Sequence, residues 1–200
     1  MERVFKYVSC IFFCVLSFVG HAQEQNTTPT KKYKFTVYGG VGPNFYFNNL
    51  VVAKDYVREV NYQFVTRFMW EPEHLLALGF ETGYNRLYSI KENPSASSEV
   101  KITNALVPIQ LVISMKFLKD YYGNFTMGQS VLLNNVSVSN NGNKNKTNAS
   151  NVSLGDFGLA VGYRKFFNTR FYLGSELKGY YSSKLNDKNI GILLMSGYRF

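Results

Sequence analysis

The chain has 200 residues, of which 46% are hydrophobic, 18% charged and 16% aromatic. This composition suits one folded domain and excludes long disorder or a coiled coil. There are 22 basic and 13 acidic residues, the formal net charge is +9, and beyond the first 22 residues no apolar run approaches the roughly 18 residues of a membrane-spanning helix.

The N-terminal segment Met1–Ala22 has the pattern of a secretory signal. A basic start precedes the apolar stretch Val8–Val19, and the small-residue end Gly20–Ala22 predicts cleavage before Gln23. A membrane anchor or a buried strand is the alternative. Both cysteines lie inside this segment, so the mature chain is expected to form no disulfide and no thiolate metal site.

The remainder predicts a short periplasmic segment, residues 23–33, followed by a β domain over residues 34–200. From Lys34 onward the apolar residues recur with period two, and no window fits a helical stripe better. Eight strands are predicted: Lys34–Phe47, Tyr56–Trp70, Leu75–Tyr88, Val100–Leu118, Tyr122–Val138, Val152–Phe166, Arg170–Tyr181 and Asn189–Phe200. They meet or exceed the 9–11 or so residues of a tilted transmembrane strand.

Each predicted strand has one apolar face and one small, polar face. The polar faces carry the charged residues Arg67, Glu81, Lys116, Asp156, Arg164, Glu176, Lys178 and Arg199. An eight-stranded barrel has an interior just wide enough for side chains, so the bulky apolar face must point outward. The sequence therefore predicts an all-β fold, an eight-stranded antiparallel up-and-down transmembrane β-barrel.

The predicted connections alternate in length, as expected for such a barrel. The short turns are 71–74, 119–121 and 167–169, and the longer polar links are 48–55, 89–99, 139–151 and 182–188. With the N-terminus in the periplasm, the long links face outward, and 140–151 is predicted to be a mobile loop. Aromatic girdles are predicted at both strand ends, with Trp70, Phe117, Tyr121, Phe166, Phe167, Phe171, Tyr198 and Phe200 inside and Phe45, Phe47, Tyr56, Tyr84, Tyr88, Tyr180 and Tyr181 outside.

Three motifs carry a resemblance to a known family. The last strand, Ile192–Phe200, resembles the C-terminal assembly signal of bacterial outer-membrane barrels through Gly197, Tyr198 and Phe200. The strand with Pro108 and the segment Ala160–Arg164 resemble strands of PorT-like barrels. The resemblance, which extends to barrels of the OmpA and OmpX type, covers residues 34–200 and implies the barrel fold, a place in the bacterial outer membrane and recognition by the barrel assembly machinery.

An enzyme is the sharpest alternative, and the residues disfavour it. Outer-membrane hydrolases generally need a histidine as general base, and His74 is the single histidine outside the signal and lies in a predicted short turn. The carboxylates near the predicted outer loops are scattered: Asp55, Glu59, Glu92, Glu99 and Asp187. We expect no enzymatic activity, no cofactor and no metal site.

The charged interior has two readings, a conducting path or a set of structural ion pairs. Eight strands leave little room, and porins use about 16 strands for an aqueous channel. We therefore expect these eight interior charges to form a structural network, in which Arg67, Glu81, Arg164 and Glu176 are ion pairs.

The basic excess predicts anionic partners at the membrane surface and no nucleic acid. Much of the excess lies in the predicted outer loops, at Lys54, Lys91, Lys144, Lys146, Lys184 and Lys188. Lipopolysaccharide and outer-membrane lipids are one expected partner, and adhesion to another anionic surface or to a protein is the other.

Taken together, these features predict a non-enzymatic outer-membrane barrel with a structural, surface-interaction or secretion-associated role. Two alternatives stay open: an OmpW-like barrel that transports or binds small solutes, and a soluble periplasmic barrel that holds a lipid with its apolar face inward.

Overall fold

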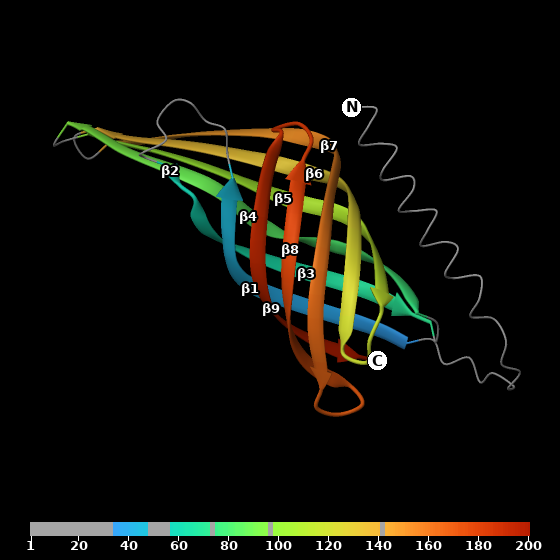
Figure 1. The fold of residues 1–200 in the computed structure, drawn as a ribbon. Helices are drawn as coiled ribbons and strands as arrows, with labels where there is room; N and C mark the ends of the chain where they lie inside the picture. The colour runs from blue at the N-terminus through green and yellow to red at the C-terminus, as the bar shows by residue number, and fades with distance from the viewer. Residues whose placement is uncertain (1–33, 48–56, 73–74, 96–97, 141–142) are drawn as a thin grey trace, which may run out of the picture. The chain divides into compact units, whose positions relative to one another are not determined.

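The computed structural model describes residues 34–47, 57–72, 75–95, 98–140 and 143–200 (Figure 1). The predicted signal, the segment 23–33, the link 48–55, Tyr56 and His74 lie outside these ranges. The described residues form nine strands: β1 Lys34–Phe47, β2 Val57–Arg58, β3 Val60–Glu71, β4 Leu76–Ser95, β5 Ser98–Lys116, β6 Tyr121–Asn140, β7 Asn143–Phe166, β8 Phe171–Ser182 and β9 Asp187–Arg199. The described part of the chain has no helix that could cross a membrane.

The strands close into a ring. From β3 to β9 each strand pairs antiparallel with the next one in sequence, and β1 pairs with both β3 and β9. The short β2 pairs with β4 and, with β3, makes up the single predicted strand Tyr56–Trp70, interrupted at Glu59. The ring therefore has eight strands in up-and-down order, and the predicted fold class is confirmed.

The predicted outer loops 89–99 and 139–151 are wrong, because most of their residues belong to strands. β4 and β5 continue as a pair to Ser95 and Ser98, and β6 and β7 to Asn140 and Asn143. In Figure 1 these four strands run on together beyond the ends of β1, β8 and β9. Polar sequence does not prevent pairing once the neighbouring strands are already in register, so 143–151 is an ordered strand and not a mobile loop.

The face assignment of the sequence holds in the structure. The apolar face points outward, with Phe80, Leu159 and Leu194 exposed by 63%, 63% and 71%. The polar face is buried inside the ring. A soluble barrel with its apolar face inward is therefore excluded for the described strands.

The outward surface changes character along β5, β6 and β7. One cross-strand row is apolar, with Val107, Val131 and Val152 side by side. Four residues farther along each strand the row is polar, with Thr103, Asn135 and Asn148, and the next row outward contains Lys101, Ser137 and Lys146. Because paired residues share a face of the sheet, these rows mark where the apolar band ends.

The ring interior also holds apolar residues, in two clusters. The first contains Tyr38, Val65, Met69, Ala77, Val112, Tyr172, Leu193 and Met195. The second contains Tyr46, Leu87, Leu106, Leu132 and Tyr180. The girdle assignment of Tyr180 is thus wrong, and half-buried Phe166 packs against the first cluster. Both sit at inward positions of their strands, which an aromatic-at-the-strand-end pattern does not distinguish.

Candidate functional site

Four charged side chains from β3, β4 and β8 meet in the middle of the ring, and we call them the central cluster: Arg67, Glu81, Glu176 and Lys178. Arg67 Nε donates to Glu81 Oε2 over 3.0 Å, and its Nη1 and Nη2 donate to the two oxygens of Glu176 over 2.9 and 3.0 Å. Lys178 donates to Glu81. Two cations and two anions balance each other here, and all four are almost fully buried.

Neutral donors complete the shell around Glu176. The hydroxyl of Tyr122 and the amide of Asn124 both donate to Glu176 Oε2, over 3.0 and 2.9 Å. Burying a carboxylate is costly unless its oxygens are hydrogen-bonded, and these donors together with Arg67 meet that need.

A second group lies at the end of the ring that carries the short connections, which we call the turn end. Glu71, buried to 4% exposure, accepts from Arg164 Nη1 over 3.0 Å and from Arg199 Nη2 over 2.8 Å. Lys116 Nζ lies 3.7 Å from Glu71, and the Tyr38 hydroxyl also donates to it. One carboxylate therefore serves three cations in this turn-end cluster.

Sequence reasoning missed Glu71, because it precedes Pro72 and was predicted as the start of a turn. The structure places it as the last residue of β3, on the same face as Arg67 and Met69. Counting in steps of two from Arg67 through Met69 places Glu71 on the same inward face, and this alternation could have identified it from the sequence. Its presence also changes the predicted pairing, since Arg164 binds Glu71 and not Glu81 or Glu176.

Asp156 lies apart from both clusters, and its hydrogen-bond partners are hydroxyls and a backbone amide. It accepts from the hydroxyls of Ser130, Ser153 and Tyr180 and from the backbone amide of Ser183. No ion pair joins Asp156 to a cation among the described residues. Hydroxyl donors, rather than a lysine or arginine, hold this buried carboxylate.

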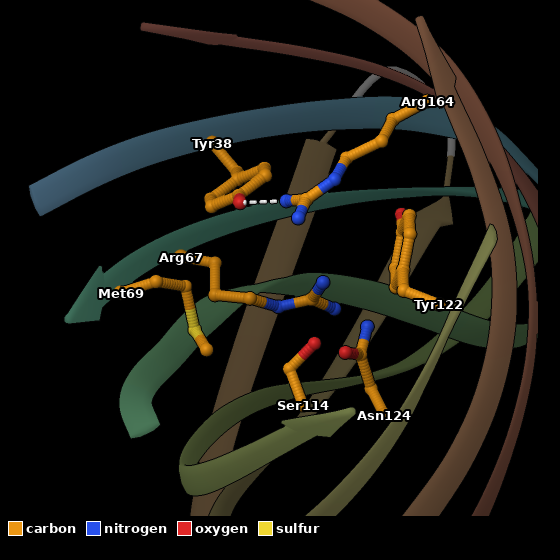
Figure 2. Close-up of a pocket in the computed structure, with 7 residues that line it drawn as sticks. All are labelled: Tyr38, Arg67, Met69, Ser114, Tyr122, Asn124 and Arg164. Carbon is orange, nitrogen blue, oxygen red and sulfur yellow. Dashed lines mark hydrogen bonds between the residues drawn. The ribbon is translucent and has the colours of Figure 1, made fainter. Parts of the chain in front are cut away.

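Figure 2 shows the small cavity between the central and turn-end clusters. Its volume is about 10 Å³, and its lining includes Arg67, Arg164, Tyr122 and Asn124. A cavity of this size holds about one water molecule. The side chains of Arg164 and Tyr38 are hydrogen-bonded across its upper part in Figure 2.

Away from the turn end, Tyr46 near the end of β1 and Asp187 at the start of β9 contact each other. Burial raises the pKa of Asp187 above the ordinary value of an aspartate, and the hydrogen bond from Tyr46 lowers it in part.

No group of three or more metal-ligating side chains occurs in the described ranges. Among the described residues, the interior thus offers ion pairs, hydroxyl–carboxylate hydrogen bonds and packed aromatics.

The residues of the predicted assembly signal divide between the two faces of β9. Tyr198 and Phe200 are 40% and 72% exposed, with ring centroids 5.0 Å apart. Gly197 faces inward, where an added Cβ would collide with the Tyr172 ring.

A row of lysines crosses the sheet that extends beyond the apolar band. Lys91 on β4 pairs directly with Lys101 on β5, which pairs with Ser137 on β6, which pairs with Lys146 on β7. Lys144, two residues along β7, lies on the same face. We call Lys91, Lys101, Lys144 and Lys146 the lysine row; Glu99, 3.3 Å from Lys91, is the acidic residue within it.

No family model and no curated protein matches the chain. Among solved structures, Ail, the attachment invasion locus protein of Yersinia pestis, in complex with the heparin analogue sucrose octasulfate, has a TM-score of 0.51 and 12% identity over 84% of this chain and 99% of that chain. Ail without that ligand gives a TM-score of 0.50 and 10% identity over the same shares. Neisserial surface protein A gives 0.40 and 14%, over 82% and 95%. The fold of this chain is that of the eight-stranded β-barrels of the bacterial outer membrane.

Proposed function

We propose that this protein is a non-enzymatic surface-interaction barrel, whose lysine row binds phosphate or sulfate groups of an anionic partner outside the cell. The barrel lies in the outer membrane, since its outward surface is an apolar band and bilayer-spanning strands must close into a ring. The ends of β4, β5, β6 and β7 run on together beyond the ends of β1, β8 and β9 in Figure 1, and we call them the sheet extension. The sheet extension then stands on the outer side of the membrane, and the turn end lies in the periplasm.

The pairing of Lys91 with Lys101 carries the proposal. Like charges directly opposite each other destabilise a sheet, and here a third lysine continues the same row two strands away. Neighbouring strands lie about 4.8 Å apart, so these ammonium groups form a line of roughly 14 Å across the sheet. A partner with closely spaced anionic groups relieves their repulsion. The heparin analogue bound by Ail is such a molecule, which supports the proposal.

The filled interior supports an interaction role over transport. The central cluster is buried and internally neutral, and the cavity beside it has room for about one water. An OmpW-like transport role needs a path for a solute, and the packed clusters leave it without support. The charged residues of the interior are accordingly proposed to be structural.

The test is binding of sucrose octasulfate and of lipopolysaccharide to the protein in lipid nanodiscs. We expect the variant Lys91→Gln/Lys101→Gln to bind the sulfated probe several-fold more weakly and with a smaller salt dependence. Lys119→Gln/Lys165→Gln, at the turn end, is the matched control and should leave binding unchanged. If Lys91→Gln/Lys101→Gln weakens binding of intact lipopolysaccharide but not of dephosphorylated lipopolysaccharide, the membrane's own lipid supplies the anionic groups. Equal binding by both variants would refute the proposal.

The narrower PorT-like assignment and a secretion-associated role are a second proposal. They are supported by Pro108, which is buried on the inward face of β5 as in the resemblance. Recognition of β9 by the barrel assembly machinery is part of it, through the exposed rings of Tyr198 and Phe200. Deletion of Phe200, followed by the fraction of heat-modifiable protein in outer-membrane preparations, tests that recognition.

A further inference from the structure

The sheet extension has one long unpaired edge, on β7. Residues 143–154 of β7 pair with β6, but the pairing of β7 with β8 begins only at Phe157. Nine consecutive residues, 144–152, are exposed. Within the described ranges, therefore, every second backbone N–H and C=O of this segment points at solvent, as in any edge strand.

The connection between β8 and β9 covers the lower part of this edge. Lys184 Nζ donates to the Val152 carbonyl over 3.1 Å, the Lys184 amide donates to Ser153 over 3.3 Å, and the Ser183 hydroxyl donates to the Leu154 carbonyl. The open part of the edge is thus 144–150, seven residues, long enough to pair with one added strand.

The opposite edge of the extension is built differently. On β4 the segment 91–95, which has no strand partner on that side among the described residues, is short and contains Pro94. Proline at an edge removes a donor and blocks pairing. The open edge of β7 contains no proline. Only one of the two edges is therefore suited to accept a strand.

We infer that the β7 edge 144–150 binds an extended acidic peptide segment by adding it to the sheet as a further strand. Lys144 and Lys146 lie on one face of the edge strand, two residues apart, and set the charge of the partner. In an added strand the residues beside them are also two apart, so the partner presents Asp or Glu at alternate positions. A second copy of this chain would bring lysine against the same surface, and like charges disfavour that pairing.

Binding of a peptide strand differs from binding of a polyanion in needing backbone pairing along β7. The two share Lys144 and Lys146, whereas Lys91 and Lys101 lie away from the edge and separate them. The probe is a synthetic eight-residue peptide with Glu alternating with Thr, and its control has Lys in place of Glu. We expect the acidic peptide alone to bind the protein in nanodiscs. Hydrogen exchange followed by NMR should then show new protection at alternate amides within 144–150, and no change in the amides bonded to β6.

The charge dependence is tested with two matched variants. Lys144→Glu/Lys146→Glu should weaken binding of the acidic peptide by about tenfold or more, since each favourable cross-strand pair becomes repulsive. Lys91→Glu/Lys101→Glu lies on the same face but away from the edge, and should change peptide binding less than about threefold while abolishing binding of sucrose octasulfate. Absence of the alternating protection, or equal loss in both variants, would overturn the inference.

Discussion

Arg67 and Glu81 form a directly opposed pair of β3 and β4, and their side chains are joined inside the ring, with 3.0 Å between Arg67 Nε and Glu81 Oε2. The same guanidinium reaches across the interior to both oxygens of Glu176 on β8. A single planar side chain therefore links strands on opposite sides of the barrel, which only the fork of an arginine achieves.

Replacing Arg67 tests how strongly this link holds the barrel. Arg67→Met leaves Glu81 with Lys178 alone and Glu176 without a cation, and breaking a buried pair costs about 3–5 kcal/mol. We expect a loss of that order in the free energy of unfolding, measured by urea titration in lipid vesicles. Arg170→Met, an exposed position near the turn end, is the control and should have little effect. A loss below about 1 kcal/mol would indicate that water, and not Arg67, solvates the two carboxylates.

Asp156 gives a contrasting prediction, because its partners are hydroxyls and an amide. Asp156→Ala removes the acceptor shared by Ser130, Ser153 and Tyr180, and the hydrogen bonds of Ser130 to Tyr180 and of Ser153 to Ser182 can satisfy only some of the freed donors. We expect a cost of about 1–3 kcal/mol in unfolding free energy. Tyr180→Phe removes one donor and should cost about 1 kcal/mol. The double variant should be less destabilised than the sum of the two singles, as urea titration measures. Strict additivity would contradict the contact between Asp156 and Tyr180.

The sequence predicts the barrel well because its information is local. Side chains alternate with period two, so the charges at Arg67, Glu81 and Glu176 are assigned inward from their own strands alone. The same alternation explains why Val65, Val112 and Leu193 are inward despite being apolar. Faces and strand number follow from the pattern without knowledge of the three-dimensional arrangement.

What the sequence does not contain is the stagger of the ring. Arg67 and Glu176 are 109 residues apart, and which inward residues meet across the interior depends on the tilt of all eight strands. Glu71 was predicted to begin a turn because proline follows it, yet it is the last residue of β3. Residues 143–151 were predicted to be a loop because they are polar, yet they form part of β7. In both cases a local composition rule was overruled by register with the neighbouring strand.

Gly197 is predicted to be needed for packing of the Tyr172 ring. Tyr172 is fully buried, and a Cβ at Gly197 would overlap its ring atoms. Gly197→Ala should therefore destabilise the barrel by about 1–3 kcal/mol, as overpacking does. Gly39→Ala is the matched control on β1, because its Cβ would meet no atom within 4 Å.

Both glycine variants are compared by the temperature at which the folded, fast-migrating gel species disappears. Adding Tyr172→Leu to Gly197→Ala should recover part of the loss, since the smaller side chain leaves space for the methyl group. Equal behaviour of the two single variants would show that the Tyr172 ring moves aside without cost.

The depth of the apolar band is tested by placing one arginine at two positions of β5. Leu111 and Thr103 lie on the same outward face, the first 51% exposed and central in the band, the second in the polar row beyond it. An arginine on the lipid face costs about 2–4 kcal/mol at the middle of the bilayer and about 0–1 near its surface. Leu111→Arg should therefore lower the free energy of unfolding in vesicles by about 2–4 kcal/mol, and Thr103→Arg by less than about 1. The same two variants in detergent micelles, whose apolar layer adapts more easily to a charge, should differ less. If Thr103→Arg were as costly as Leu111→Arg in vesicles, the lipid would reach beyond the valine row, and the lysine row would lie too close to the headgroups to bind a soluble partner.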